Sequence, residues 1–365
     1  MAPPRRLPEL IDGATEEILL RIAPEEPAHL VRASLVCKLW RRLLVDPAFV
    51  RRYREFHRTP PMLGFFQNQL AAADRVHAPW FVPTTSAPPL PQLAFEYSTG
   101  WEVLSSCHGR VLVGHGSIGM NLVVWDPVTR LRQRLPMPRM RLCFNYSYAV
   151  LCAVGSCNHL DCHGGPFLVV SVGSCPVVSA PATDRLARAC VYSSETRAWG
   201  TPTSVDLGVS GNVNNKRSGA VVRDGIYFAL TWGERILKFD LVKNCLSIIF
   251  TPDVYQCGVC SSLHLWSRKL DPKGSAGWVQ CRVIDLEKLF PINNPRSQPR
   301  VIGFAEGLGV IFLWTDVGVF MMELKSGRKR KVGESRVIGT IIPFMSFYTP
   351  DCGSRKLPPH MQERN

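Results

Sequence analysis

The sequence lacks a leader-like N-terminus and any long uninterrupted apolar run. Its first eight residues are rich in proline and arginine and do not resemble a signal peptide. The most apolar long stretch, residues 301–322, is interrupted by Glu306 and Asp316, whereas a membrane helix needs about 18 apolar residues in a row. We therefore expect a protein that does not span a membrane and that acts in the cytoplasm, the nucleus or both.

Signatures of several enzyme classes are also missing. The sequence has no Gly-x-Ser-x-Gly elbow, no His-Glu-x-x-His pair and no Walker-type phosphate loop. Cys107 and His108 are adjacent in sequence, which does not by itself set a nucleophile against its base. We expect a non-catalytic protein without catalytic residues or a cofactor.

Residues 114–119 match Gly-x-Gly-x-x-Gly, a pattern that binds dinucleotides only where a helix begins at the glycines. The residues that follow, 121–125, instead predict a strand. A glycine-rich hairpin turn is therefore favoured over a nucleotide site.

Acidic residues are scarce relative to basic ones, and the formal net charge is +14. This charge fits an acidic protein partner, nucleic acid or simple solubility, and charge alone does not choose among them. The densest basic run, residues 328–331, follows a turn-like segment, so a solvated loop is favoured over a nuclear-import signal. No interleaved pattern of aromatic and basic residues supports readout of RNA or DNA, so nucleic acid is not the expected partner.

Cysteine is abundant, at 13 residues, and without a leader we expect reduced thiols. One stretch is dense in potential ligands, and Cys257 and Cys260 offer a further short pair about a hundred residues away. Zinc sites favour such short spacings, but buried cysteine also serves as a small apolar core residue. We expect a strand-connecting loop without metal, with zinc as the alternative. The dense stretch contains Cys152, Cys157, His159, Cys162 and His163.

Helical signals cluster in the first 60 residues. Apolar residues recur at helical spacing in three runs, at 18–22, 27–33 and 35–44. Asp46 followed by Pro47 is typical of an N-cap and a first helical position, and predicts a fourth helix. From spacing alone, this part is a small helical bundle with an amphipathic surface.

Two segments carry patterns that are more specific than helical spacing requires: Leu10-x-Asp12-x-x-x-x-Glu17-Ile18-Leu19-x-Arg21-Ile22 and Ser34-Leu35-Val36-Cys37-Lys38-Leu39-Trp40-Arg41. These segments resemble the F-box family. The continuation at 46–66 resembles the large F-box family of grasses, and the resemblance covers about the first 65 residues. The second segment is the most specific part.

The resemblance implies a partner. F-box modules dock on a small Skp-family adaptor, which links them to a cullin, through apolar anchors buried between helices. Some of the matching residues must instead fill the core of the module, and the sequence does not separate the two sets. Because the adaptor of the family is acidic, basic residues such as Lys38 would steer the encounter. The residues carried over as adaptor-binding are Leu10, Ile18, Leu19, Ile22, Leu30, Val31, Leu35, Val36, Lys38 and Trp40.

The segment Gly13-Ala14-Thr15 departs from the family, which has an acidic residue and an apolar pair there. Glycine costs about 1 kcal/mol inside a helix. Losing a packed leucine side chain typically costs about 2–5 kcal/mol. This departure predicts weakened adaptor binding.

After Pro61 the pattern changes to short apolar runs separated by turn signals, rich in β-branched and aromatic residues. Residues 75–93 are rich in proline, alanine, serine and threonine, and we expect them to be irregular. The apolar runs lie at 110–113, 121–125, 167–170, 225–230, 235–239, 277–283, 309–314 and 318–322.

A weak repeat runs through this part: an apolar strand ends in an acidic residue and a polar turn follows. The spacing of these acids fits a four-stranded propeller blade of about 40–50 residues, and residues 63–350 would hold about six blades. The pattern resembles the kelch-like, F-box-associated β domains of plant F-box proteins, with a pair of β-sandwiches as the alternative. The repeated acids are Asp126, Asp240 and Asp285, with looser copies at Glu195 and Glu323.

We expect an α+β multidomain chain. It would comprise an F-box helical domain at 7–60, a linker with a first irregular β segment at 61–100, a six-bladed β-propeller-like domain at 101–350 and a flexible tail at 351–365. The resemblance implies a substrate-recognition subunit of a Skp–cullin–F-box (SCF) type E3 ubiquitin ligase, whose target protein is unknown. A protein-binding scaffold outside a ligase, a metal-dependent enzyme and a nucleic-acid-binding protein are the alternatives.

Overall fold

The structure is a computed structural model of the chain. It describes residues 12–71, 76–85, 100–115, 121–138, 140, 143–162, 164–176, 185–208, 211–215, 217–231, 235–252, 262–270, 276–294, 297–335 and 339–350. The predicted tail at 351–365 lies outside these residues.

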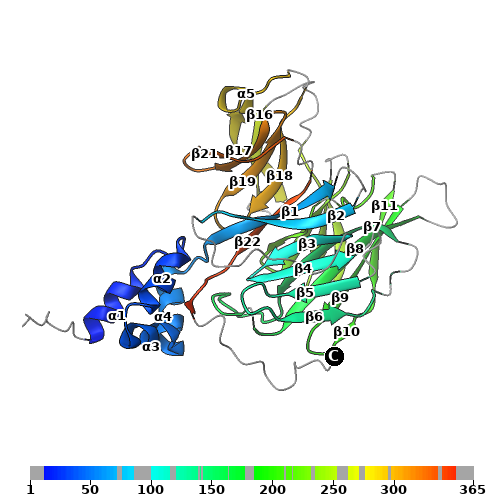
Figure 1. The fold of residues 1–365 in the computed structure, drawn as a ribbon. Helices are drawn as coiled ribbons and strands as arrows, with labels where there is room; N and C mark the ends of the chain where they lie inside the picture. Colours follow the sequence, from blue (N-terminus) through cyan, green and yellow to red (C-terminus); the bar gives the residue numbers. More distant parts are fainter. Residues whose placement is uncertain are drawn as a thin grey trace, which may run out of the picture.

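Four helices form a bundle at one side of the molecule (Figure 1): α1 (Asp12–Leu20), α2 (Pro27–Ser34), α3 (Lys38–Val45) and α4 (Pro47–His57). The sequence predicts that Leu35 and Val36 lie in the third helix. This prediction is wrong, because α3 begins at Lys38 and both residues precede it. Leu35 caps the C-terminus of α2, and the Cys37 side chain caps α3 by accepting a hydrogen bond from the Trp40 backbone N–H. None of the helices in the described part of the chain is long and apolar enough to cross a membrane.

The regular elements in the rest of the described chain are β-strands, apart from one short helix. Three strands make the first sheet: β2 (Val76–Pro83), β1 (Met62–Ala71) and β22 (Ile341–Met345). The second sheet contains β3 (Trp101–Cys107), β4 (Arg110–His115), β5 (Asn121–Trp125) and β6 (Arg132–Leu135). The third contains β7 (Phe144–Cys152), β8 (Phe167–Pro176) and β9 (Arg185–Ser193), with β10 (Ala198–Trp199) and β11 (Thr203–Gly208) both paired to β9.

The later strands continue this arrangement. The fourth sheet contains β12 (Ala220–Val222), β13 (Gly225–Ala229), β14 (Arg235–Asp240) and β15 (Cys245–Phe250). A hairpin of β16 (Ser262–Leu270) and β17 (Ala276–Asp285) follows, with the short helix α5 (Leu286–Leu289). The last sheet contains β18 (Arg300–Ala305), β19 (Val310–Thr315), β20 (Gly318–Glu323) and β21 (Lys329–Gly333).

The sheets are joined into a ring by the pairing of the last strand with the first. Strand β22, near the C-terminus, pairs antiparallel with β1, and the two lie side by side in Figure 1. Strands β18 and β3 contact β22 from the two neighbouring sheets, β3 contacts β7, and β11 contacts β15. This is a β-propeller rather than a pair of sandwiches.

The prediction of six blades is wrong: the described strands form five blades of three to five strands each. The sixth sheet is the two-stranded β16–β17 hairpin, which packs through Leu263 and Leu265 against the apolar face of β19 and β20. The miscount has a local cause at Asp285, whose carboxylate accepts a hydrogen bond from the Lys288 backbone N–H and caps α5. The repeat predicts that Asp285 marks a blade, whereas in the structure it begins a helix.

Elsewhere the repeated acid closes the turn between the third and fourth strands of a blade. Asp126 accepts hydrogen bonds from the backbone N–H groups of Val128 and Thr129 after β5. Asp240 does the same for Lys243 after β14. A short polar side chain that bonds the backbone two or three residues ahead stabilises such turns, which explains why the acids recur.

The prediction of an irregular segment at 75–93 is wrong for residues 76–83, whereas residues 75 and 86–93 lie outside the described residues. Residues 76–83 form strand β2, which pairs with β1 over eight positions from Gly64↔Pro83 to Ala71↔Val76. Its two prolines, at 79 and 83, are tolerated because β2 lies at the edge of its sheet, where no ladder hydrogen bond is needed on the outer side.

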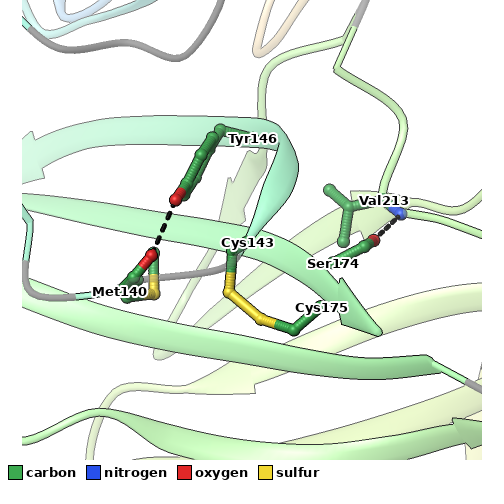
Figure 2. The surroundings of a disulfide bond; sticks show 6 residues. All are labelled: Met140, Cys143, Tyr146, Ser174, Cys175 and Val213. Carbon is green, nitrogen blue, oxygen red and sulfur yellow. Dashed lines mark hydrogen bonds between the residues drawn. A yellow bond between two sulfur atoms is a disulfide. The ribbon is translucent and has the colours of Figure 1, made fainter. Parts of the chain in front are cut away.

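One pair of cysteines departs from the expected reduced state. Cys143 and Cys175, 32 residues apart, are joined by a disulfide (Figure 2). Strands β7 and β8 pair antiparallel, with Phe144 opposite Ser174, so the register brings the cysteines at the end of this hairpin together. The bond lies in a small apolar cluster with Met140 and Cys190.

Candidate functional site

The helical module has an apolar core to which all four helices contribute, and Phe347 of the propeller joins it. Leu19, Leu20, Leu30, Leu44 and Tyr53 are at most 1% exposed and pack together across all four helices. The Tyr53 hydroxyl donates a hydrogen bond to the Ile22 carbonyl at 2.8 Å, which joins α4 to the end of α1. Ile22 and Trp40 are half-buried against the same cluster. Several residues carried over as adaptor-binding therefore fill the core.

A second set of apolar side chains is left outside this core. Leu35 and Val36, in the connection between α2 and α3, are 77% and 64% exposed. Leu39, one turn further on, is 42% exposed, and Ile18 on α1 is 50% exposed. Exposed apolar side chains grouped in this way mark interaction surfaces. We call Leu35, Val36 and Leu39 the α2–α3 apolar tip.

The structure thus divides the predicted adaptor-binding residues into groups. Leu19 and Leu30 are buried, and Ile22, Val31 and Trp40 are half-buried. Ile18, Leu35, Val36 and Lys38 are exposed, and Leu10 lies outside the described residues. Leu39 was missed, although its position between Lys38 and Trp40 was part of the matching segment.

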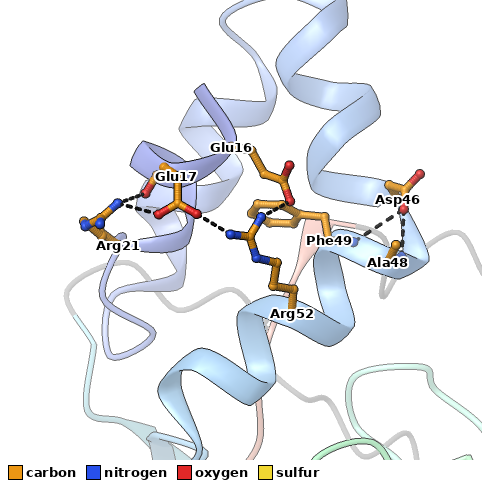
Figure 3. A network of polar contacts seen from close by, with 7 residues as sticks. All are labelled: Glu16, Glu17, Arg21, Asp46, Ala48, Phe49 and Arg52. Carbon is orange, nitrogen blue, oxygen red and sulfur yellow. Dashed lines mark hydrogen bonds and ion pairs between the residues drawn. The ribbon is translucent and has the colours of Figure 1, made fainter. Parts of the chain in front are cut away.

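A network of polar contacts joins α1 to α4 (Figure 3). The Arg52 guanidinium on α4 bonds the carboxylates of both Glu16, at 2.7 Å, and Glu17 on α1. The Asp46 carboxylate caps α4 by accepting hydrogen bonds from the backbone N–H groups of Ala48 and Phe49, which confirms the predicted N-cap. Such ion pairs on the surface contribute little energy, about 0–1 kcal/mol each, so they orient the helices more than they stabilise them.

The departure at Gly13-Ala14-Thr15 lies in the first turn of α1. Thr15 is buried, whereas Gly13 and Ala14 are exposed. A Cβ atom added to Gly13 would meet nothing within 4 Å. The surface at this end of α1 is therefore flat and open, where the family has larger side chains.

Helix α4 also anchors the module to the propeller. The Tyr53 ring packs edge-on against Phe347, with ring centroids 6.3 Å apart, and Leu160 joins the same apolar cluster. Arg54, buried to 2% exposure, forms an ion pair with Asp161. Leu160 and Asp161 belong to the β7–β8 connection. Contacts from this connection therefore hold the helical module against the propeller.

A cavity of about 400 Å³ opens where the blades meet. Asn68 of β1, Glu102 of β3 and Arg300 of β18 line it, so it lies between strands of three different blades. Arg217, also in the lining, donates a hydrogen bond to the Val301 carbonyl at 2.9 Å, and the Arg300 guanidinium lies over the Trp314 ring at 4.7 Å. Charged side chains and an aromatic ring therefore both line the cavity.

Cys107 and His108 do not form a nucleophile and base. Burial raises the pKa of the Cys107 thiol to about 12 and lowers the pKa of His108 to about 4. The His108 ring stacks on His159, with centroids 3.9 Å apart. No hydrogen bond joins Cys107 to His108 in the described part of the chain, so the pair lacks the geometry of a catalytic dyad.

The glycine-rich motif lies in a hairpin. Gly114 and His115 end β4, and β5, which begins at Asn121, pairs antiparallel with it. Residues 116–119 lie outside the described residues. The next element among the described residues is a strand, whereas a dinucleotide site needs a helix that begins at the glycines.

Most of the basic run at 328–331 lies in a strand, whereas the sequence predicts a solvated loop there. Lys329, Arg330 and Lys331 lie in β21, the edge strand of the last blade, and all three are exposed. Exposed lysine and arginine on an edge strand discourage pairing with other chains, which gives these charges a structural role.

The Cys/His-dense stretch is compact in space. One ligand atom from each of Cys152, Cys157, His159 and Cys162 lies within 4.8 Å of the other three. His163, Cys257 and Cys260, the other residues considered for a metal, lie outside the described residues. These four side chains are the group in the described structure that could hold a metal ion.

A family model described as F-box-like matches residues 16–55. The helical module is an F-box-like domain. The match begins within α1 and ends within α4, and so covers the core and the α2–α3 apolar tip. A search of the curated proteins finds no match.

Solved structures match this chain only at low identity and low TM-score. The nidogen/laminin complex has a TM-score of 0.37 at 11% identity, covering 78% of this chain and 98% of that chain. AztD from Citrobacter koseri has a TM-score of 0.32 at 8% identity, covering 77% and 96%. Dihydro-heme d1 dehydrogenase NirN has a TM-score of 0.26 at 9% identity, and the match spans 76% of this chain but only 46% of NirN. None of these similarities bears on function.

Proposed function

We propose that this chain is the substrate-recognition subunit of an SCF-type E3 ubiquitin ligase. The F-box-like domain docks on a Skp-family adaptor, and through it on a cullin, while the propeller holds a target protein. The chain itself is not catalytic. It raises the effective concentration of target lysines beside the ubiquitin-charged enzyme. The proposal includes a propeller of the kelch-like, F-box-associated kind found in plant F-box proteins, and action in the cytoplasm, the nucleus or both.

The α2–α3 apolar tip is the observation that carries this proposal. The core of the F-box-like domain is complete without Leu35, Val36 and Leu39, so packing within the domain does not explain why they are apolar. Apolar side chains that fill pockets on a partner contribute most of the binding energy of an interface. A helical adaptor surface is the occupant that the F-box-like match supports.

The charge around the tip favours an acidic partner. Lys38, Arg41 and Arg42 are exposed on or beside α3, and no acidic residue lies in its first turn. Complementary charge of this kind raises the rate of encounter more than the final affinity. Adaptor binding should therefore be faster at low salt than at high salt.

The central cavity is the candidate place for the target. It combines the charges of Glu102, Arg217 and Arg300 with the Trp314 ring. Two blade-connecting segments, β11–β12 and β21–β22, also contribute residues to its lining. Loops on a rigid scaffold commonly carry binding residues. A peptide segment of the target is the proposed ligand.

The test is co-elution of the full chain with a purified Skp-family adaptor and a cullin N-terminal region in size-exclusion chromatography. The full chain is required because Tyr53 and Arg54 are covered by the propeller and would be exposed in a helical fragment. A ternary complex is expected for the native chain. The double variant Leu35→Asp/Val36→Asp should elute alone, whereas Val242→Asp, at a site 78% exposed on the propeller, should co-elute. Failure of the folded native chain to co-elute would contradict the proposal.

A protein-binding scaffold outside a ligase is the second candidate. The open surface at Gly13 and Ala14 favours it, because an adaptor would lose contacts there. This candidate predicts that the propeller captures its partner while the full chain leaves the adaptor unbound.

A further inference from the structure

We propose that Cys152, Cys157, His159 and Cys162 bind one structural zinc ion, which braces the propeller loop that holds the F-box-like domain. The spacing is Cys-x(4)-Cys-x-His-x(2)-Cys, and the ligand atoms lie within 4.8 Å of one another. With Zn–S distances of about 2.3 Å and Zn–N of about 2.0–2.1 Å, tetrahedral ligand atoms lie roughly 3.5–3.8 Å apart. The Cys162 Sγ and His159 Nδ1 atoms are already 3.7 Å apart.

The ligand types select the metal. Three thiols and one imidazole match the Cys₃His sets of structural zinc sites, whereas calcium and magnesium prefer oxygen ligands. Cys152 and Cys162 are buried and Cys157 and His159 are half-buried, so the four side chains enclose the site on most sides. A fully protein-ligated, closed site of this kind is structural and leaves no open position for catalysis.

Groups around the ligands already support metal binding. The Cys152 sulfur accepts a hydrogen bond from the Val154 backbone N–H at 3.4 Å, and the Cys157 sulfur accepts one from the His159 backbone N–H at 3.3 Å. The His108 ring lies flat against the His159 ring, with an interplanar angle of 6°, and so fixes the plane of the imidazole. Outer contacts of this type orient metal ligands and tune their basicity.

Arg110 supplies the charge that such a site needs. Its guanidinium is 2% exposed and donates hydrogen bonds to the carbonyl oxygens of Cys162 and Gly165, at 2.6 Å for Gly165. No carboxylate pairs with it among the described residues. A zinc ion with three thiolates and a neutral imidazole carries one net negative charge, which would offset the buried cation.

The position of the site explains what the metal would do. Cys152 ends β7, and the other three ligands lie in the connection to β8. Leu160 and Asp161, which contact the F-box-like domain, stand between His159 and Cys162. A zinc ion that ties both ends of this short segment would therefore hold Asp161 in place for Arg54 on α4.

The test is the metal content of the full chain, purified from zinc-supplemented medium and dialysed against metal-free buffer. Mass spectrometry of the digested protein should find one zinc per chain, and replacement by cobalt should give the sulfur-to-cobalt charge-transfer absorption of a tetrahedral thiolate site. Cys157→Ser should retain less than about a tenth of the zinc, whereas Cys245→Ser, at a half-buried cysteine outside the cluster, should retain all of it. Folding of both variants is checked by circular dichroism.

A second readout needs no variant. Removing zinc from the folded native chain with a chelator should raise the rate of proteolysis within residues 153–166 at least tenfold, and added zinc should restore protection. The proposal is overturned if the folded native chain holds neither zinc nor cobalt, if Cys157→Ser retains zinc fully, or if proteolysis does not respond to the chelator. Zinc content does not depend on adaptor binding, so either result leaves the ligase proposal to its own test.

Discussion

The buried guanidinium of Arg54 on α4 pairs with the carboxylate of Asp161 in the β7–β8 connection, and this ion pair joins the F-box-like domain to the propeller. Arg54 is 2% exposed, whereas Asp161 is 48% exposed. Beside them, Tyr53 packs on Phe347, which follows the ring-closing strand β22. The two parts of the chain therefore share one interface, which sets the direction in which the α2–α3 apolar tip faces.

Removing the carboxylate should leave a buried cation without its partner. We expect Asp161→Asn to lower the free energy of unfolding by about 2 kcal/mol, less than a fully buried pair would lose, because water reaches Asp161. Urea unfolding measures this. Asp224→Asn, the same change at an exposed turn, is the control and should be close to neutral. Equal stability of the two variants would contradict the anchoring role of the pair.

The cap of α4 should be measurable by itself. Asp46→Ala removes the acceptor for the Ala48 and Phe49 backbone N–H groups and should cost about 1 kcal/mol. Asp46→Asn keeps an acceptor in the same place and should lose much less. Thermal unfolding followed by circular dichroism compares the two, and equal losses would show that the carboxylate does not act as a cap.

How far the sequence predicts this molecule depends on how local each feature is. The helices at 27–33 and from Pro47 were predicted closely because proline, capping residues and helical spacing act within a few residues. Spacing could not separate buried Leu19 from exposed Leu35, because both are leucines in the matching segments and burial depends on how the helices cross. The same limit hid the contact between Arg54 and Asp161, which lie far apart in sequence.

Blade counting failed for a related reason. Asp240 and Asp285 both follow an apolar strand, yet one closes a hairpin turn and the other caps α5. The residues after each acid decide which local structure forms, and both choices satisfy the same backbone donors. The central cavity was not predictable, since its lining comes from strands of three blades brought together only by ring closure.

The contact between the first and second blades gives a prediction at Asn68. Its side-chain amide donates a hydrogen bond to the Val103 carbonyl and accepts one from the Val103 backbone N–H, both at 2.8 Å, and so links β1 to β3. Asn68→Ala leaves both backbone groups without this partner and should lower the free energy of unfolding by about 1–3 kcal/mol. Asn121→Ala, at an exposed strand end, is the matched control. A neutral Asn68→Ala would show that the blades are held without this link.

The turn at Asp240 should make stability depend on pH. The hydrogen bond from the Lys243 backbone N–H, with a smaller contribution from Lys238, lowers the pKa of the Asp240 carboxyl. Because the folded pKa lies below the unfolded value of about 3.9, the stabilisation is present above that pH and is lost as the pH falls through the folded pKa.

We therefore expect the free energy of unfolding of the native chain to decline from about pH 5 to about pH 2 more steeply than that of Asp240→Asn. Urea unfolding at each pH measures the slopes, and Asp224→Asn should keep the slope of the native chain. Parallel curves for the native chain and Asp240→Asn would contradict the assignment.

The most direct test of the proposed function is the dissociation constant of the full chain for a purified Skp-family adaptor, measured by isothermal titration calorimetry. We expect measurable binding by the native chain and the same affinity for Val242→Asp. The affinity of Leu35→Asp should be at least about tenfold lower, equivalent to about 1.4 kcal/mol. Native affinity in Leu35→Asp would show that the α2–α3 apolar tip is not the docking surface. No binding by the folded native chain would contradict the ligase role itself.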